Sequence, residues 1–256
     1  FQPTAALPTD TQIFWRVTAN NVCGGTASAV FSFTTQPGPG QCSTGTPTQV
    51  VFEDDIEGGD NGWTHAAASG SVDSWTRGSA SHGGSFAWQA ANPSAGAPNE
   101  QWLVSPSVTL PTDLNGLNLQ FWNQQSLKPG GGGCYDGAIL ELSTDGGSNW
   151  TPVQAQSLLT DPYDGTISGS FGNPLGGDMG WCGDPQAYLN SVVDLQAYGG
   201  QTVRFRFDLG HDRFAHRAGT AWAIDDVKVQ GCGSSQPDDT IFDDGYEGAT
   251  PYSGHQ

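Results

Sequence analysis

Apolar and polar residues alternate over short stretches along most of the chain, and clusters of Gly, Asn, Asp and Pro separate these stretches. Alternation with a period of two is typical of β-strands that bury one face. The clearest strand segments after residue 47 are Val50–Phe52, Ser85–Gln89, Gln101–Val104, Asn118–Trp122, Ala138–Ser143, Ser191–Leu195, Thr202–Leu209 and Ala221–Val229. Many short strands without a long helical period predict an all-β fold, a β-sandwich.

The N-terminal region predicts a separate β-hairpin. Residues 12–19 and 29–34 alternate as strands, and the turn-rich residues 20–26 join them. The strands carry four large aromatic residues, Phe14, Trp15, Phe31 and Phe33. A lone hairpin is marginally stable in water, so we expect a partner sheet from elsewhere to cover these rings.

A segment rich in Pro and Gly, residues 37–47, follows the hairpin region of residues 1–36 and predicts a linker. Short alternating strands then continue through residues 48–232, the expected main domain. Residues 233–256 form a second linker and a C-terminal tail. We expect this tail to be either a flexible terminus or a strand donated to a neighbouring chain.

Composition supports one sizeable domain with smaller flanking pieces. Of the 256 residues, 37 are Gly, 16 are Pro and 36% are hydrophobic, which leaves little material for two large cores. The 9 Trp, 12 Phe and 6 Tyr are nevertheless too many aromatic residues for a disordered chain.

The charge balance limits the possible partners and the compartment. Only 8 Lys and Arg face 26 Asp and Glu, so the formal net charge is -18 at pH 7. Such a field repels phosphate backbones and anionic lipids, so we expect no nucleic-acid partner and no membrane insertion. An acidic, lysine-poor chain with scattered cysteines suits an oxidising compartment, and we expect a secreted protein that is extracellular or at the cell surface.

The hairpin region carries a first family resemblance. The segments T-D-T-Q-I-F-W-R-V-T-A-N-N (residues 9–21) and A-V-F-S-F-T-T (residues 29–35) resemble the last strands of a fibronectin type III domain, as found in bacterial secreted enzymes. The resemblance covers residues 1–36 and implies that the first half of that domain lies outside this sequence.

The main domain carries a second resemblance, through short motifs in order along the chain. They are D-I-E-G-G-x-N-G-W-T from Asp55, D-S-W from Asp73, L-V-S-P from Leu103, L-x-F-W from Leu119, Y-D-G-A-x-L-E-x-S-T-D-G-G from Tyr135 and A-I-D-D-V-K-V from Ala223. Together they resemble the MAM-like jelly-roll family, which includes the cleaved-adhesin and choice-of-anchor J domains of secreted bacterial proteins. The resemblance implies a galactose-binding-like jelly-roll sandwich, while a fold alone names no ligand.

The second resemblance also implies a structural calcium ion. Family members often bind calcium where the opening strand meets the closing strand, which maps to Asp55, Glu57, Asp225 and Asp226. Calcium is a hard ion that takes several oxygen ligands. Adjacent residues of a strand point to opposite faces, so Asp225 and Asp226 can both be ligands only with a local distortion. The alternative is a solvated acidic strand end.

Five cysteines predict two disulfides and one odd thiol. Cys134 and Cys182 flank a long irregular segment that a disulfide would restrain, so we expect them to pair. Cys42 and Cys232 bracket the sandwich, whose first and last strands should be neighbours; we expect this pair too, with two unrelated thiols as the alternative. Cys23, at the hairpin tip, is too far from Cys42 to join it.

No motif in the sequence organises catalysis. The sequence contains no G-x-S-x-G elbow, phosphate-binding loop, C-x-x-C pair or dinucleotide fingerprint. His211 and His216 lack the H-E-x-x-H spacing of a zinc protease, and we expect an exposed loop pair. Asp145 belongs to S-T-D-G-G-S-N-W, an Asp-box hairpin motif whose role is structural.

The sequence therefore predicts a protein that is not an enzyme. Our principal expectation is an adhesion or binding accessory module of a larger secreted bacterial protein, a peptidase or an adhesin. Its partner would be a protein, or a fragment of its own precursor, that completes the N-terminal sheet. One alternative is a self-associating filament subunit built by strand exchange. Another is a carbohydrate-binding module that stacks glycans on aromatic rings of the Tyr163–Trp181 loops, although burial of these rings is the simpler expectation.

Overall fold

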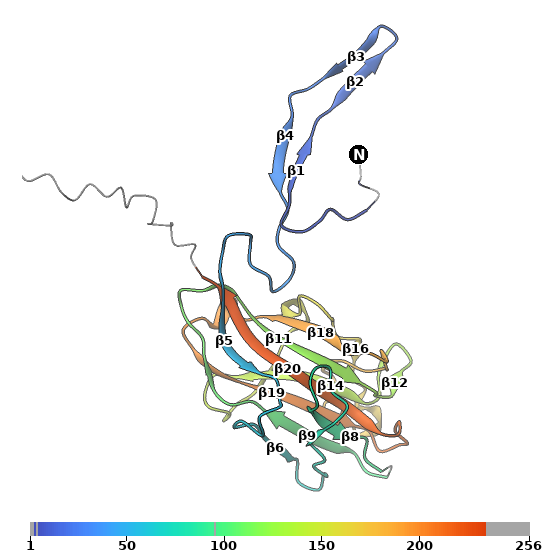
Figure 1. Cartoon of the computed structure of the whole chain (residues 1–256). Coiled ribbons are helices and arrows are strands. Elements are labelled where there is room, and N and C mark those ends of the chain that lie inside the picture. Colours follow the sequence, from blue (N-terminus) through green and yellow to red (C-terminus); the bar gives the residue numbers. More distant parts are fainter. Residues whose placement is uncertain (1–2, 4, 95, 234–256) are drawn as a thin grey trace, which may run out of the picture.

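The computed structural model describes residues 3, 5–94 and 96–233, and Figure 1 shows their arrangement. A long β-ribbon projects from a β-sandwich. The described elements are β-strands and short 3-10 turns, so the predicted all-β fold with a sandwich is confirmed. In the described part of the chain, no helix is long and apolar enough to cross a membrane. The expected tail, residues 234–256, lies outside the described residues.

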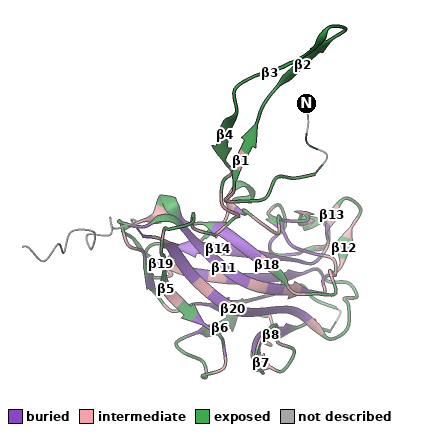
Figure 2. Cartoon of the chain, turned by 45° about the horizontal axis from the view of Figure 1, so that its top comes forward, coloured by how far each residue is buried: buried purple, intermediate pink, exposed green. Residues whose placement is uncertain are grey.

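The N-terminal ribbon is a two-part antiparallel hairpin. Strand β1 (Gln12–Trp15) pairs with β4 (Phe31–Thr34), and β2 (Thr18–Asn21) pairs with β3 (Gly24–Ala27). The predicted hairpin is therefore present, with strands that extend into the expected turn. Almost all of its residues are exposed, as the green ribbon in Figure 2 shows.

The first sheet of the sandwich is built around the long strand β20, which pairs with β11 on one side and with β8 and β5 on the other. All these pairs are antiparallel. In order, its strands are β18 (Leu189–Asp194), β11 (Asn115–Gln125), β20 (Thr220–Cys232), β8 (Ala87–Ala91) and β7 (Thr76–Gly78), with β5 (Thr48–Asp54) beside β20. The first strand of the sandwich thus lies next to its last, as expected.

The second sheet packs against the first. In order, its strands are β15 (Thr151–Pro152), β14 (Gly137–Ser143), β19 (Thr202–His211), β9 (Asn99–Val104) and β6 (Thr64–Ala67), with β10 (Val108–Thr109) beside β19. Short pairs in the loops at one end are β12 (Pro129–Gly130) with β13 (Gly133–Cys134) and β16 (Gly165–Thr166) with β17 (Met179–Gly180).

Aromatic side chains from both sheets interlock to form the core. Phe121 of β11 meets Phe207 of β19 edge to face, with ring centroids 5.1 Å apart, and Trp222 of β20 lies 5.7 Å from Phe207. All three are fully buried. Because side chains alternate between the two faces of a strand, these rings point toward the opposite sheet. The apolar positions from which the strands were predicted are therefore the residues that form the core.

Two disulfides close the sandwich. Cys42 is bonded to Cys232 and Cys134 to Cys182, which are the pairs expected from the sequence. Cys23 is a free, exposed thiol at the ribbon tip. The first bond fastens the linker beside the end of β20, and the second anchors the loops that carry β16 and β17.

The Asp-box has the structural role expected of it. The Asp145 carboxylate accepts hydrogen bonds from the backbone N–H groups of Ser148 and Asn149, and from the Ser143 hydroxyl. These hydrogen bonds, the one from Asn149 first, hold the pKa of Asp145 well below its usual range. The charged carboxylate therefore orders the turn between β14 and β15.

Candidate functional site

Three of the expected calcium ligands gather around one loop, residues 81–86. Glu57 accepts hydrogen bonds from the backbone N–H groups of Ser85 and Phe86, both at 2.7 Å. Asp225 accepts from the N–H of His82 at 2.7 Å, and the carboxylate of Asp226 lies 2.6 Å from Nδ1 of His82. Three carboxylates, one from the turn after β5 and two from the middle of β20, thus surround a loop that follows β7.

A bulge in β20 brings Asp225 and Asp226 to the same loop. The register of β11 against β20 slips between Gln120 and Trp122, and Asp226 has a φ of 46°. This is the local distortion that two adjacent carboxylates need to face one site. Burial is the main cause that raises the pKa of Asp225, and the amide hydrogen bonds from Gly83 and His82 oppose it.

Asp55 does not join the other three candidates at loop 81–86. It is exposed and accepts a hydrogen bond from the N–H of Glu57. Its neighbour Asp54 is the buried residue, and its carboxylate accepts from Ile56 N, Asn61 Nδ2 and Trp63 Nε1. Within the described chain, no three of the four predicted ligands bring oxygens within 4.8 Å of one another.

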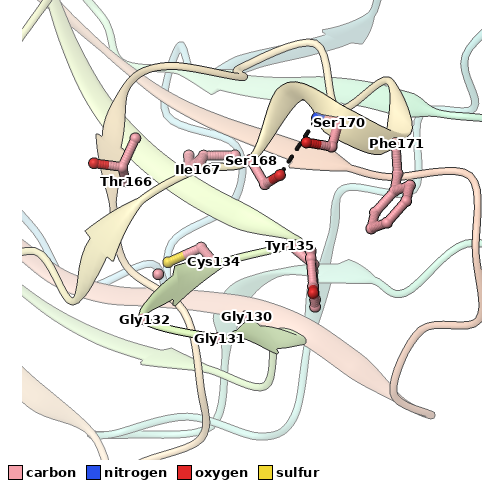
Figure 3. A pocket seen from close by; sticks show the side chains of 11 residues that line it. Gly130, Gly131, Gly132, Cys134, Tyr135, Thr166, Ile167, Ser168, Ser170 and Phe171 are labelled. Atoms are coloured by element: carbon pink, nitrogen blue, oxygen red, sulfur yellow. Dashed lines mark hydrogen bonds between the residues drawn. The ribbon is translucent and has the colours of Figure 1, made fainter.

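A pocket of about 390 Å³ opens between the β12–β13 turn and the segment after β16. Figure 3 shows the half-buried rings of Tyr135 and Phe171 at one end, with centroids 5.5 Å apart, and the hydroxyls of Ser168 and Ser170 beside them. A Cβ on Gly133 would lie 2.4 Å from the carbonyl oxygen of Thr166, so glycine allows the two walls to meet. The pocket therefore combines ring faces with hydroxyl and backbone groups.

The aromatic rings that the sequence offered for glycan stacking lie mainly in the core. Tyr163 and Trp181 are 8% and 0% exposed, which confirms that burial was the simpler expectation. Asp161 accepts from Ser191 Oγ and Asn123 Nδ2, and burial raises its pKa. Of the rings in these loops, Phe171 reaches the pocket, and its partner Tyr135 directly follows Cys134.

The β1–β4 ribbon has one apolar face and one mixed face. Cross-strand partners lie on the same face of an antiparallel pair. The pairs Ile13–Phe33 and Trp15–Phe31 form the apolar face, and Trp15 stacks on Phe31 at 5.0 Å. Trp15, Phe31 and Phe33 are 47%, 49% and 46% exposed. The ribbon therefore presents a row of apolar rings to solvent, as one sheet of a sandwich would without its second sheet.

The expectation of an exposed histidine pair was wrong. His211 is fully buried at the end of β19, and the His216 side chain is 1% exposed in the following loop. Their ring centroids are 4.9 Å apart. His211 continues the inward alternation of β19 beyond Leu209, a signal that could have placed it inside. Nothing in the spacing indicated that the loop folds His216 back over it.

Comparison with known proteins gives low similarity. No protein-family model matches the chain, and no curated protein matches it in sequence. A cleaved adhesin domain of Lys-gingipain from Porphyromonas gingivalis aligns at 19% identity over 72% of this chain and 99% of that domain, with a TM-score of 0.43. A second cleaved adhesin domain of the same protein aligns at 19% identity over 73% and 99%, with a TM-score of 0.38.

A carbohydrate-binding module gives a similar result. The C-terminal family 22 module of a Clostridium thermocellum protein aligns at 12% identity over 73% of this chain and 96% of that module, with a TM-score of 0.37. At such TM-scores and identities the likenesses establish neither a family nor a function for this chain.

Proposed function

We propose that this chain is a non-catalytic binding module of a larger extracellular protein, joined to it through the β1–β4 ribbon. The observation that carries the proposal is the one-sided apolar face of Ile13, Trp15, Phe31 and Phe33. Two disulfides support an oxidising, extracellular location.

The chemistry of the face favours a second β-sheet as its occupant. Sheets that pack face to face bury alternate residues, and the apolar face is made by such alternate residues, Ile13 and Trp15 of β1 and Phe31 and Phe33 of β4. Edge-to-edge strand addition would pair backbone groups and leave these rings uncovered. We therefore assign the occupant to further strands of the same larger protein, which complete a fibronectin-like sandwich. A second copy of this chain is the competing occupant.

Hydroxyl-radical footprinting with mass spectrometry tests this proposal. The isolated chain and the intact parent protein are oxidised in parallel, and oxidation is measured at Trp15 and Phe31. We expect both residues to be reactive in the isolated chain and protected in the parent, while Phe14 on the mixed face stays reactive in both. Equal reactivity in the two samples would overturn the proposal. Protection that grows with the concentration of the isolated chain would instead assign the face to self-association.

A second candidate function is carbohydrate binding at the pocket between the β12–β13 turn and the segment after β16. The pairing of ring faces with hydroxyl donors suits a sugar, whose C–H face packs on an aromatic ring while its hydroxyls hydrogen-bond at the edge. Tyr135 and Phe171 supply the rings, and Ser168 and Ser170 supply the hydroxyls.

Calorimetric titration with a panel of soluble polysaccharides tests the second candidate. We expect Phe171→Ala to weaken binding by about 2 kcal/mol, because it removes a central aromatic contact. Phe14→Ala, an exposed ring on the ribbon, is the matched control and should leave binding unchanged. Failure of all polysaccharides to bind, or unchanged affinity in Phe171→Ala, rules this function out.

We further propose that a structural calcium ion binds between the carboxylates of Glu57, Asp225 and Asp226, a group that we call the Glu57 corner. Asp55 would lie outside the direct ligands and add negative charge. The convergence of three carboxylates on one glycine loop supports it, because calcium takes oxygen ligands from separate segments. A Cβ on Gly84 would lie 2.4 Å from Oε1 of Glu57, so the loop sits tightly within the corner. When bound, calcium would hold this loop to β5 and β20.

A further inference from the structure

A buried group of metal-ligating side chains lies where β14 begins and β19 ends. Asp136 precedes β14, His211 ends β19, and His216 lies in the loop that leads to β20. One ligand atom from each lies within 4.8 Å of the other two. Asp136 and His211 are 0% exposed, and the His216 side chain is 1% exposed.

Each histidine leaves a ring nitrogen without a partner. Nδ1 of His211 and Nε2 of His216 are buried and have no hydrogen-bond partner among the described residues. Buried polar atoms in folded proteins are nearly always paired, so two orphans in one cluster need an explanation. A bound cation that accepts the lone pairs of both nitrogens would explain why neither has a hydrogen-bond partner.

The hydrogen bonds around the cluster fix which nitrogens carry lone pairs. The Asn92 amide donates from Nδ2 to the carbonyl of Ser126, which turns its Oδ1 toward Nε2 of His211 at 3.1 Å. His211 therefore carries its proton on Nε2 and its lone pair on Nδ1. A metal-bound histidine usually donates its other N–H to such an oxygen, which fixes the ring.

The charge and spacing of the cluster also suit a cation. Asp136 and the fully buried Asp212 place two carboxylates here, against one lysine, Lys128, whose Nζ lies 3.5 Å from Asp212. Nδ1 of His216 lies 3.0 Å from Oδ2 of Asp136. His216 therefore donates its Nδ1 proton to Asp136, which fixes the ring and leaves the lone pair on the unpaired Nε2.

We propose that Asp136, His211 and His216 bind a divalent transition-metal ion with the preferences of Zn²⁺. Two imidazoles and one carboxylate are the donors that such ions take, whereas calcium and magnesium prefer oxygen alone. The bound ion would fasten the 213–219 loop to the start of β14.

Metal titration of the full chain tests the site. The chain is first freed of metal by chelator dialysis, and Zn²⁺ is then titrated by calorimetry and Co²⁺ by visible absorption. We expect one ion per chain and the absorption of a four-coordinate Co²⁺. Excess Ca²⁺ should not compete. If the wild-type chain binds neither Zn²⁺ nor Co²⁺, the proposal is wrong, and no variant is needed to show it.

Graded variants identify the ligands. His216→Ala, in a surface loop, should weaken Zn²⁺ binding by more than about 100-fold, and Asn92→Ala, which removes only the support of His211, by about 10–100-fold. His65→Ala is the matched control, because His65 also lies 2.6 Å from a carboxylate, Asp73, but is half-exposed. Unchanged affinity in His216→Ala, or equal loss in His65→Ala, would place the ion elsewhere.

Discussion

The carboxyl group of Asp208 is fully buried in the middle of β19, on the face of the strand opposite Phe207. Its Oδ2 lies 3.3 Å from Nη2 of Arg206, but neither oxygen accepts a hydrogen bond from the described residues. Arg206 also pairs with Glu141. One guanidinium therefore serves two buried carboxylates. Burial is the main cause that raises the pKa of Asp208 well above its usual value, and the nearby Glu141 and Glu100 add to it.

The raised pKa of Asp208 predicts how stability depends on pH. Between the unfolded-state pKa and the higher folded-state pKa of Asp208, the folded chain keeps this proton while the unfolded chain loses it. The unfolding free energy therefore falls as pH rises through that range. At pH values above the folded-state pKa, Asp208→Asn should raise the unfolding free energy by about 1.4 kcal/mol for each pH unit that separates the folded and unfolded pKa values. The gain should vanish in acid. Urea unfolding across pH checks this, with exposed Asp113→Asn as the control. A gain that is independent of pH would contradict it.

Single residues also mark the limit of prediction from the sequence. The Asp225–Asp226 pair was recognised as needing a distortion, but the bulge that supplies it depends on the pairing of β20 with β11, which no local pattern encodes. The burial of His216 likewise depends on where its loop lies relative to β14. Local sequence indicates the types of side chain, whereas long-range pairing decides which of them meet.

At the scale of elements, alternation located the strands of the sandwich well but not their ends. The predicted segment Asn118–Trp122 is the middle of β11, which runs from Asn115 to Gln125. Its polar residues Asn123 and Gln125 are buried, and they donate hydrogen bonds to the Asp161 carboxylate and the Cys182 carbonyl in the neighbouring loops. The edge strands β6 and β7 were missed, because their exposed residues have no apolar alternation.

The Cys134–Cys182 bond is the main constraint on the loops between β13 and β18. It closes a sequence separation of 48 residues, for which chain entropy predicts a stabilisation of about 4 kcal/mol. Cys134→Ser with Cys182→Ser should therefore lower the unfolding free energy by about that amount in denaturant titration. Cys23→Ser, at the free thiol, should change nothing. A double variant as stable as wild type would show that contacts other than the disulfide keep the loops in place.

At the scale of the whole molecule, the two-sheet sandwich and the adjacency of its first and last strands followed from the pattern of short strands. The separate N-terminal hairpin was also predicted, from the alternation in residues 12–19 and 29–34, whereas its projection from the sandwich was not. The sequence could not identify the ligand, because the pocket walls, residues 130–135 and 166–171, are far apart along the chain and meet only in three dimensions.

Calcium should act on the whole sandwich if it binds at the Glu57 corner. Binding to the folded state alone raises the unfolding free energy by about 2.7 kcal/mol when calcium is at 100 times its Kd. We expect a higher Tm in calcium than in a calcium chelator, and a smaller difference in Glu57→Gln. Glu53→Gln, at an exposed residue of β5 four positions before Glu57, should behave as wild type. Identical Tm values in calcium and chelator would exclude the ion.

In our proposal, this chain works as a module of a larger extracellular protein. Denaturing mass spectrometry of the native secreted material, with electron microscopy of the same sample, tests it most directly. We predict peptides of this chain within a polypeptide larger than its 26.8 kDa, or in a stable complex with a fragment that supplies the second sheet. Regular polymers composed of the 26.8 kDa chain alone would contradict the account and make the protein a filament subunit.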